Sequence, residues 1–271
     1  MNPLISVVIP VLNGEDSLSF CIQSLKDQSF AGFEVIVVDG NSTDGSSLLA
    51  RQLLEAGSIG FTVESKADRC VYEAMNRGIA ISRGEWIYFL GCDDILYCRE
   101  SFESIYTHLL DDYTDLVIAN VSFDDMGCHI SRQFDFHEIL HRNFCQQAIL
   151  YRKRLFDRLG NFNTRYRIYA DWDFNIRCFL SGTPYRFVDV ILARYNTSGL
   201  SSRAGDQIFH NELRLNEFLY RFRFSSGVGK FKYLDHILLC YVLIQYRNLM
   251  FMCKKFFRFI RLARTWFREG P

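Results

Sequence analysis

The sequence lacks a net charge, because its 31 lysines and arginines are matched by 31 aspartates and glutamates. Nothing in this balance indicates a nucleic-acid partner, and we expect none. The nine cysteines include no Cys-x-x-Cys pair and follow no regular spacing. An odd, unpatterned set is typical of reduced and mostly buried thiols, so we expect a cytoplasmic protein.

Several nucleotide and nucleophile signatures are also missing. The chain has neither a P-loop nor a Gly-x-Gly-x-x-Gly motif, which argues against a dehydrogenase or a P-loop enzyme. No Gly-x-Ser-x-Gly elbow is found, so no protein nucleophile is evident. Residues 1–14 have no basic start followed by a long apolar stretch, and we expect a strand there rather than a signal peptide.

The length and the local charge bound the organisation of the chain. A chain of 271 residues with 49% hydrophobic content suits one sizeable domain, alone or with a small appendage. From Lys230 onward there are nine basic and two acidic residues, a balance of +7, so residues 1–229 carry −7. The C-terminal part is therefore distinct in composition.

Four continuous apolar runs predict buried strands, at residues 5–11, 33–40, 85–91 and 115–120. Runs without polar alternation are typical of a sheet that is covered on both faces. The segments between the first three runs carry apolar residues at three- and four-residue steps, which predicts helices. The alternation indicates an α/β protein with a mostly parallel sheet, flanking helices and a C-terminal helical extension.

Acidic and polar residues follow three of these runs. Asn13 follows the first run, Asp39 ends the second, and Asp93 and Asp94 follow the third. In an open parallel sheet, ligands bind beyond the carboxyl ends of the strands, so these residues are expected to face one crevice. The pair of carboxylates suits Mg²⁺ or a similar hard cation, with Asp93 as the ligand and Asp94 as a secondary candidate. The alternative is that one of them caps a following helix.

Two further motifs carry candidate nucleotide contacts. The loop of "VVDGNSTDGS" can present Asp39 to a nucleoside, although the same residues suit a plain turn. In "ADRCVYEAMNRG", Asp68 and Arg69 precede an amphipathic helix that carries Asn76 and Arg77. Arginine suits phosphate, but a solvated helix face is the alternative for Arg77.

The segment "YADWDFNIRC" places Asp171 and Asp173 on either side of a tryptophan. A carboxyl that is partly buried beside an aromatic ring can have a raised pKa, which suits a general base. The alternative is an acidic residue that stabilises the N-terminus of a helix. Each aspartate can fill one of these roles.

These motifs, with "SVVIPVLNGEDSL" and "CQQAILYRKRLFDRLGNFN", occur in the order found in glycosyltransferase family 2, which the chain resembles over roughly residues 1–202. The resemblance is to bacterial members that build O-antigen, capsule or exopolysaccharide. It implies a GT-A fold with a Rossmann-like sheet in residues 1–203, of which about 1–120 bind the nucleotide-sugar and 121–203 the acceptor. Residues 204–271 would then form C-terminal basic and aromatic helices.

The resemblance also implies roles for individual residues. It assigns nucleoside contacts to Val11, Glu15, Asp39 and Asp68, and it makes Asp93 the last acid of an Asp-x-Asp motif. That motif binds Mn²⁺ or Mg²⁺ across the diphosphate. Asp171 matches the general base of the family, Asp173 matches a polar position two residues on, and Ser201 lies in a segment near the diphosphate.

Three residues depart from the family pattern. Gly91 replaces the first acid of Asp-x-Asp, Gln146 replaces the histidine of a frequent His-Gln pair, and Cys70 replaces a glycine. Gln146 is kept as a secondary site candidate. The first two departures keep an inactive homologue open, acting as a membrane-bound scaffold.

Taken together, the sequence predicts an inverting, metal-dependent glycosyltransferase that uses a nucleotide-sugar, most simply a UDP-sugar. The sugar transferred would be a hexose or an N-acetylhexosamine. The acceptor would be a hydroxyl of a lipid-linked saccharide in surface polysaccharide synthesis. A nucleotidyltransferase, which also uses a parallel sheet and acid-bound Mg²⁺, is the enzymatic alternative.

The basic C-terminal segment, residues 231–268, mixes Lys and Arg with Phe and Trp near helical spacing. Arg247 interrupts its apolar run too early for a membrane span of about 20 residues. This composition favours a helix lying on an anionic membrane surface, which would make the protein peripheral at the inner face of the cytoplasmic membrane. A core helix or a dimer contact with extended basic side chains is the alternative.

Overall fold

The computed structural model describes residues 2–123, 127–129, 136–196, 205–210 and 212–213. Residues 1–209 form one compact unit and residues 210–271 a second. The predicted C-terminal helices fall almost entirely outside the described residues, as do Ser201 and the predicted membrane segment 231–268. Within the described part of the chain, no helix is long and apolar enough to cross a membrane.

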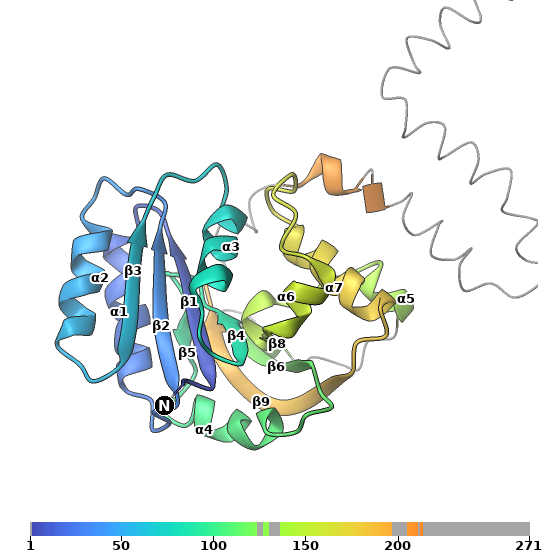
Figure 1. The fold of residues 1–271 in the computed structure, drawn as a ribbon, viewed down its shortest axis with the longest axis horizontal. Helices are drawn as coiled ribbons and strands as arrows, with labels where there is room; N and C mark the ends of the chain where they lie inside the picture. The colour runs from blue at the N-terminus through green and yellow to red at the C-terminus, as the bar shows by residue number, and fades with distance from the viewer. Residues whose placement is uncertain (1, 124–126, 130–135, 197–204, 211, 214–271) are drawn as a thin grey trace, which may run out of the picture. The chain divides into compact units, whose positions relative to one another are not determined.

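The elements of the first unit alternate between strands and helices at its start (Figure 1). The strands are β1 (Ile5–Val11), β2 (Phe33–Asp39), β3 (Gly60–Ser65), β4 (Trp86–Phe89), β5 (Ile95–Leu96), β6 (Leu116–Phe123), β7 (Gly127–His129), β8 (Ile149–Arg152) and β9 (Tyr185–Tyr195). The helices are α1 (Glu15–Lys26), α2 (Ser46–Glu55), α3 (Val71–Ile81), α4 (Ser101–Tyr106), η1 (Thr107–Leu109), α5 (Phe136–Ile139), η2 (Gln146–Ala148), α6 (Arg154–Leu159) and α7 (Ala170–Leu180).

The parallel part of the sheet has the order β3-β2-β1-β4. All residues of β1, β2 and β4 are buried, as their continuous apolar runs predict. In Figure 1, α1 and α2 lie on one side of these strands and α3 on the other. Their apolar stripes explain this cover, since Leu18, Ile22 and Leu25 of α1 are fully buried.

The rest of the sheet is built differently. β8 lies next to β4 and antiparallel to it, β6 is antiparallel to β8, and β9 is parallel to β6. The predicted α/β class with flanking helices is confirmed, and the sheet is mixed beyond β4. The reason is that β8 enters the sheet between β4 and β6, so the fourth predicted strand is not the neighbour of the third.

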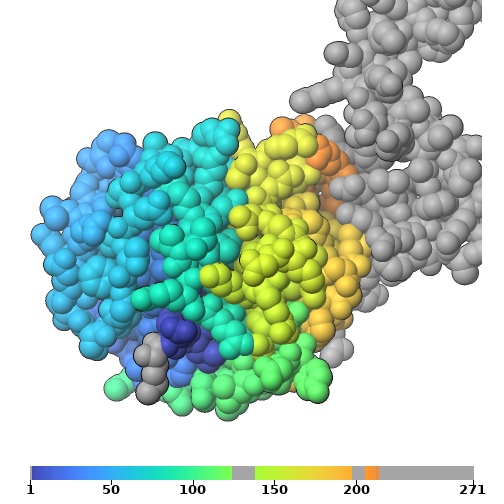
Figure 2. Space-filling view, viewed as in Figure 1, coloured from blue at the N-terminus to red at the C-terminus, as the bar shows by residue number. Residues whose placement is uncertain are grey.

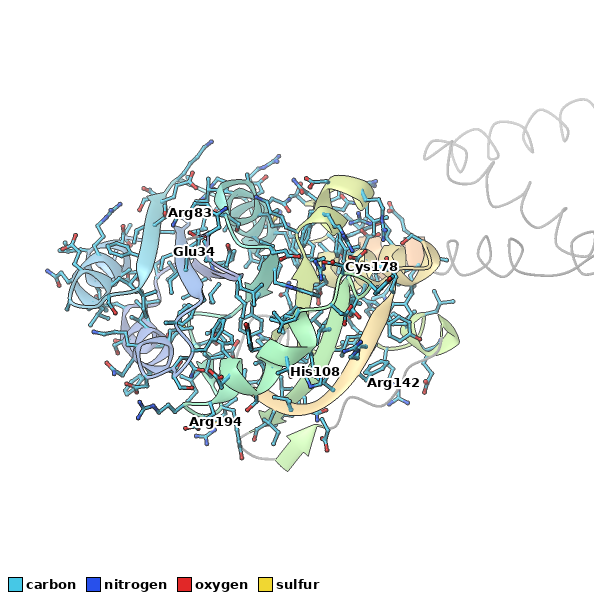
Figure 3. The ribbon with its side chains drawn as sticks, turned by 60° about the horizontal axis from the view of Figure 1, so that its bottom comes forward. Glu34, Arg83, His108, Arg142, Cys178 and Arg194 are labelled. Atoms are coloured by element: carbon cyan, nitrogen blue, oxygen red, sulfur yellow. The ribbon has the colours of Figure 1, made fainter. Side chains whose placement is uncertain are left out.

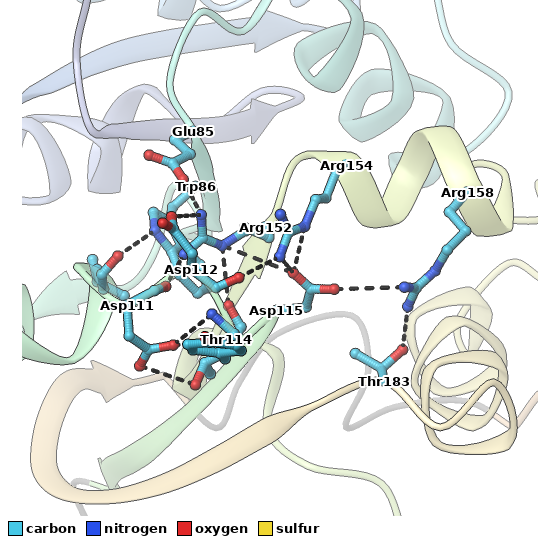
Figure 4. Close-up of polar contacts among 12 residues, drawn as sticks. Glu85, Trp86, Asp111, Asp112, Thr114, Asp115, Arg152, Arg154, Arg158 and Thr183 are labelled. Atoms are coloured by element: carbon cyan, nitrogen blue, oxygen red, sulfur yellow. Dashed lines mark hydrogen bonds and ion pairs between the residues drawn. The ribbon is translucent and has the colours of Figure 1, made fainter.

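An ionic cluster joins these added strands to β4 (Figure 4). Arg152 of β8 is only 3% exposed, donates to Glu85 and to the Thr114 carbonyl at 3.0 Å, and stacks over Trp86. Asp115 pairs with Arg154 at 2.6 Å and with Arg158 at 3.6 Å. Because each buried charge has a partner, the cluster satisfies groups that would otherwise be costly to bury.

The amino ends of the parallel strands are closed by a second polar group. Glu34 of β2 is 2% exposed and accepts hydrogen bonds from the Ser6 hydroxyl at 2.7 Å and from Arg83 Nε at 2.8 Å. Figure 3 shows Glu34 and Arg83 together at this end of the sheet. The carboxyl ends of β1 and β4 are left to face a cavity.

Candidate active site

The cavity has a volume of about 380 Å³ and lies beyond the carboxyl ends of β1 and β4. It is lined by the loops after these two strands, by α3 and η2, by the segment before α7 and by the end of β9. Its charged lining residues, among those that the structure describes, are Asp93, Asp94 and Arg167. Of the residues predicted to face one crevice, Asn13, Asp93 and Asp94 line this cavity, whereas the buried Asp39 does not.

Asp93 presents an unpaired carboxylate to the cavity. It follows β4 by a few residues, is partly exposed, and forms no hydrogen bond or ion pair within the described part of the chain. A carboxylate without an internal partner is available to a ligand. The rigid, buried end of β4 fixes its position.

Asp94 is turned into the protein and is 2% exposed. Its Oδ1 accepts the Asn196 N–H at 2.9 Å, and its Oδ2 accepts Gln147 Nε2 at 2.6 Å and the Gly91 N–H at 3.2 Å. Burial raises the pKa of Asp94 to about 6. The capping alternative for this acid pair is wrong, because the short strand β5 follows directly and the next helix begins only at Ser101.

The donor set at Asp93 fits a hard divalent cation that takes its remaining ligands from phosphate and water. No cluster of three or more histidine, cysteine or acidic side chains suited to a metal occurs in the described residues. The described residues therefore do not form a metal site in which the protein supplies every ligand. Carboxylate oxygen of the kind Asp93 provides is the ligand that Mg²⁺ and Mn²⁺ prefer.

Gly91 packs closely against the carboxylates of Asp93 and Asp94. A Cβ atom at this position would lie 2.5 Å from Asp94 Oδ2 and 2.9 Å from Asp93 Oδ1. An aspartate at position 91 therefore has no room while both carboxylates keep their places. An acid at position 91 would therefore require the Asp93 or the Asp94 carboxylate to move.

Asp171 lies in the first turn of α7 and is 8% exposed. Its Oδ1 is 2.7 Å from the Tyr72 hydroxyl, and its Oδ2 accepts Asn143 Nδ2 at 2.6 Å. Burial raises the pKa of Asp171, and these hydrogen bonds act in the opposite direction. Asp171 does not itself line the cavity, but Tyr72 does.

Tyr72 links Asp171 to the lining of the cavity. Its hydroxyl contacts two acceptors, Asp171 Oδ1 and the Ile168 carbonyl oxygen, but carries one proton. The hydroxyl proton is donated to the Asp171 carboxylate or to the Ile168 carbonyl oxygen, and donation to Asp171 stabilises the charged form of the carboxyl.

A buried polar chain continues behind Asp171. Asn143 Oδ1 accepts Asn175 Nδ2 at 2.8 Å, and Asn175 Oδ1 accepts the Tyr151 hydroxyl at 2.9 Å. Asn175 and Tyr151 are fully buried. The chain fixes the rotamer of Asn143 and, through it, the orientation of the Asp171 carboxyl.

Beside the cavity, Val11, Asp39 and Asp68 converge on Gly40. A Cβ atom on Gly40 would lie 3.4 Å from Asp68 Oδ2 and 3.5 Å from the Val11 carbonyl oxygen. The Asp39 carboxylate is 1% exposed and accepts the Ser42 N–H at 3.1 Å. Three of the four predicted nucleoside contacts are thus brought together.

The fourth predicted contact, Glu15, and the residue Arg69 before α3 lie apart from this group. Glu15 is exposed at the start of α1, where its N–H donates to Asp44 at 3.0 Å. Arg69, with a side chain that is 86% exposed, pairs with Glu73 one helical turn on. Neither side chain lines the cavity.

Arg77 and Asn76 are engaged within the protein. Arg77 pairs with Asp68 and donates to the Lys66 carbonyl at 3.1 Å, so it orients Asp68. Asn76 makes two 3.0 Å hydrogen bonds to the backbone of Phe162. In Figure 2 the surface of α3 adjoins that of the segment before α7, in agreement with this link.

The two remaining secondary candidates differ in position. Asp173 pairs with Arg177 at 2.9 Å, and Arg177 in turn donates to the Leu159 carbonyl at 2.6 Å, so Asp173 supports a loop. Gln146 lines the cavity. Its neighbour Gln147 holds Asp94.

Sequence reasoning missed Tyr72, Asn143, Gln147 and Arg167. Tyr72 lies inside a quoted motif, one position before Glu73, and its place on the buried face of α3 is the signal that could have found it. Asn143 and Arg167 come from the irregular middle of the chain. No local pattern in the sequence points to them.

The fold is the GT-A fold of glycosyltransferases. The fold is similar to that of TarS from S. aureus in a complex with UDP-GlcNAc (TM-score 0.69, 16% identity, 90% of this chain and 74% of that one). It is also similar to that of the mannosyltransferase PcManGT from Pyrobaculum calidifontis in complex with GDP-Man and Mn²⁺ (TM-score 0.62, 18% identity, 92% and 71% covered).

Residues 6–174 match the family model "Glycosyl transferase family 2", and the chain belongs to this family. A PGL/p-HBAD biosynthesis glycosyltransferase of Mycobacterium bovis is 36% identical over 233 residues, covering 84% of this chain and 87% of that protein. The predicted family, GT-A fold and glycosyltransferase activity are thereby confirmed.

Proposed function

We propose that this glycosyltransferase moves a sugar from a nucleoside-diphosphate-sugar to a hydroxyl group, with inversion at the anomeric carbon and with a divalent cation. We further propose UDP as the nucleotide and a lipid-linked saccharide of surface polysaccharide synthesis as the acceptor. The observation that carries the proposal is that the unpaired Asp93 carboxylate and Tyr72, the partner of Asp171, line the same cavity.

In this proposal Asp171 is the general base. The acceptor hydroxyl gives its proton to the Asp171 carboxylate as its oxygen forms a bond to the anomeric carbon. The bond between that carbon and the diphosphate oxygen breaks, and the nucleoside diphosphate leaves with the electron pair. Attack from the opposite face inverts the anomeric carbon without a covalent enzyme intermediate.

Asp93 would hold the Mn²⁺ or Mg²⁺ ion. When bound there, the ion supplies Lewis-acid neutralisation of the departing diphosphate. Val11, Asp39 and Asp68 would receive the nucleoside beside the cavity. The complexes of TarS with UDP-GlcNAc and of PcManGT with GDP-Man and Mn²⁺ support a nucleotide-sugar donor and a cation.

Analysis of the released product tests the reaction class. Incubation with UDP-GlcNAc or another UDP-hexose, Mn²⁺ and an undecaprenyl-diphosphate-linked sugar is expected to release UDP. Nuclear magnetic resonance of the new linkage is expected to show the opposite anomeric configuration to that of the donor. Release of pyrophosphate would instead indicate nucleotidyl transfer, and absence of nucleotide binding would indicate a scaffold.

Peripheral membrane association through residues 231–268 is proposed from the sequence alone. The full chain is expected to float with vesicles that contain about one-third phosphatidylglycerol, and a chain ending before Phe231 is expected to remain at the bottom of the gradient. High salt should weaken the association, because basic residues act through screened charges. Equal flotation of both chains would refute this role.

A further inference from the structure

We propose that Arg167 binds the diphosphate of the donor nucleotide. This inference rests on the proposed function. It adds to that function a cationic side chain that neutralises the negative charge of the diphosphate. The argument begins with the charges of the cavity. Apart from Arg167, its charged lining residues within the described part of the chain are the acids Asp93 and Asp94.

A nucleoside diphosphate brings several negative charges into this cavity, and its leaving oxygen gains more as the glycosidic bond breaks. Asp94 already accepts three hydrogen bonds, and a cation on Asp93 balances only part of the charge. Gln146, which also lines the cavity, is neutral. A cationic side chain on the cavity wall would supply what is lacking.

Arg167 has an uncommitted guanidinium. Its side chain is exposed and lines the cavity, and it forms no hydrogen bond or ion pair within the described residues. By contrast, Arg77, Arg152 and Arg177 each pair with a carboxylate. An arginine that is free to act as a planar donor matches two phosphoryl oxygens at once, which a lysine cannot do.

The backbone beneath Arg167 is held firmly. Asp206 is 7% exposed, and its Oδ2 accepts the N–H groups of Arg167 at 2.6 Å and of Ile168 at 3.2 Å. On the other side, the Ile168 carbonyl receives the Tyr72 hydroxyl. The segment is thus fixed between a buried carboxylate and the tyrosine that contacts Asp171, while the Arg167 side chain stays available.

The test is calorimetric titration of the full-length chain with UDP and with GDP in Mn²⁺ buffer. Whichever nucleotide binds the wild type is then measured with Arg167→Ala, Arg167→Lys and the control Arg165→Ala. The control removes the same charge two residues away, from a side chain that does not line the cavity. The matching nucleoside, uridine or guanosine, is measured by ligand-observed nuclear magnetic resonance.

We expect Arg167→Ala to weaken nucleotide binding roughly 10- to 100-fold, the range for a lost hydrogen bond to a charged group. Arg167→Lys should fall between, Arg165→Ala should match the wild type, and nucleoside binding should not change. Thermal unfolding without ligand should be unaltered, because the Arg167 side chain has no partner among the described residues. Wild-type nucleotide binding by Arg167→Ala, or an equal loss for the nucleoside, would overturn the inference alone. Failure of the wild type to bind either nucleotide would overturn the proposed function, and the inference with it.

Discussion

Asp171→Asn is expected to lower the rate of sugar transfer by about 100- to 10,000-fold, which is the usual contribution of a general base. The amide cannot take a proton from the acceptor hydroxyl. It keeps the shape of the buried carboxyl and can still bond to its two partners, so the fold should be retained. The measurement is the turnover of a radiolabelled sugar, with circular dichroism as the check on folding.

Two companion variants sharpen this result. Asp173→Asn removes the other candidate base, whose carboxylate is occupied by Arg177. If Asp173→Asn abolished transfer and Asp171→Asn did not, the assignment of the base would be reversed. We expect Asp173→Asn to act through the loop that Arg177 holds, and so to lower the melting temperature more than the turnover.

The pH profile provides the second companion. A base works deprotonated, so transfer should rise with pH through the pKa of Asp171, which burial raises. The hydrogen bond from Tyr72 opposes that rise. Tyr72→Phe should therefore raise the pKa further and move the acidic limb of the profile to higher pH. If the acidic limb of the Tyr72→Phe profile did not move, the titration of Asp171 would not control the rate of transfer.

Asp93→Ala is expected to reduce transfer on the order of 1,000-fold, since a metal Lewis acid contributes several kcal/mol to stabilising the departing charge. If Mn²⁺ tightens UDP binding by the wild type, as the proposed function expects, the variant should lose this effect. Calorimetry with and without Mn²⁺ measures this second effect independently of turnover. Because Asp93 forms no hydrogen bond to any residue that the structure describes, folding should not suffer.

The matched control for this variant is Asp16→Ala, which removes an exposed acid of α1 outside the cavity. It should bind Mn²⁺ and UDP as the wild type does. A wild type whose transfer is indifferent to a chelator would contradict the metal role of Asp93. So would an Asp93→Ala variant that still responds to Mn²⁺.

Much of the parallel sheet could be predicted because the residue pattern of each strand is contained in a short stretch of sequence. The runs that form β1, β2 and β4 are apolar at every position, and the loops after them carry Asn13, Asp39 and Asp93. The position of β8 could not be predicted in this way. A four-residue strand gives little periodic signal, and its place beside β4 depends on long-range packing such as Arg152 against Trp86.

The acids of the site divide by the same logic. Sequence shows that Asp93 and Asp94 are adjacent, but which of them faces the cavity depends on donors far along the chain, Gln147 and the backbone of Asn196. Likewise, the sequence alone favours Arg77 as a phosphate ligand, whereas in the structure its guanidinium pairs with Asp68. The residue types could be predicted locally, while their hydrogen-bond partners required the tertiary structure.

The order of strands in the sheet has a consequence for synthesis on the ribosome. β5, which is synthesised before residue 100, pairs with β9, which ends at Tyr195. In the same way, Asp94 can accept its hydrogen bond from the Asn196 N–H only after residue 196 has been synthesised. Contacts of such wide sequence separation form slowly, because a long loop must close before they contribute. The nascent chain can therefore complete its cavity only after about 200 residues have emerged.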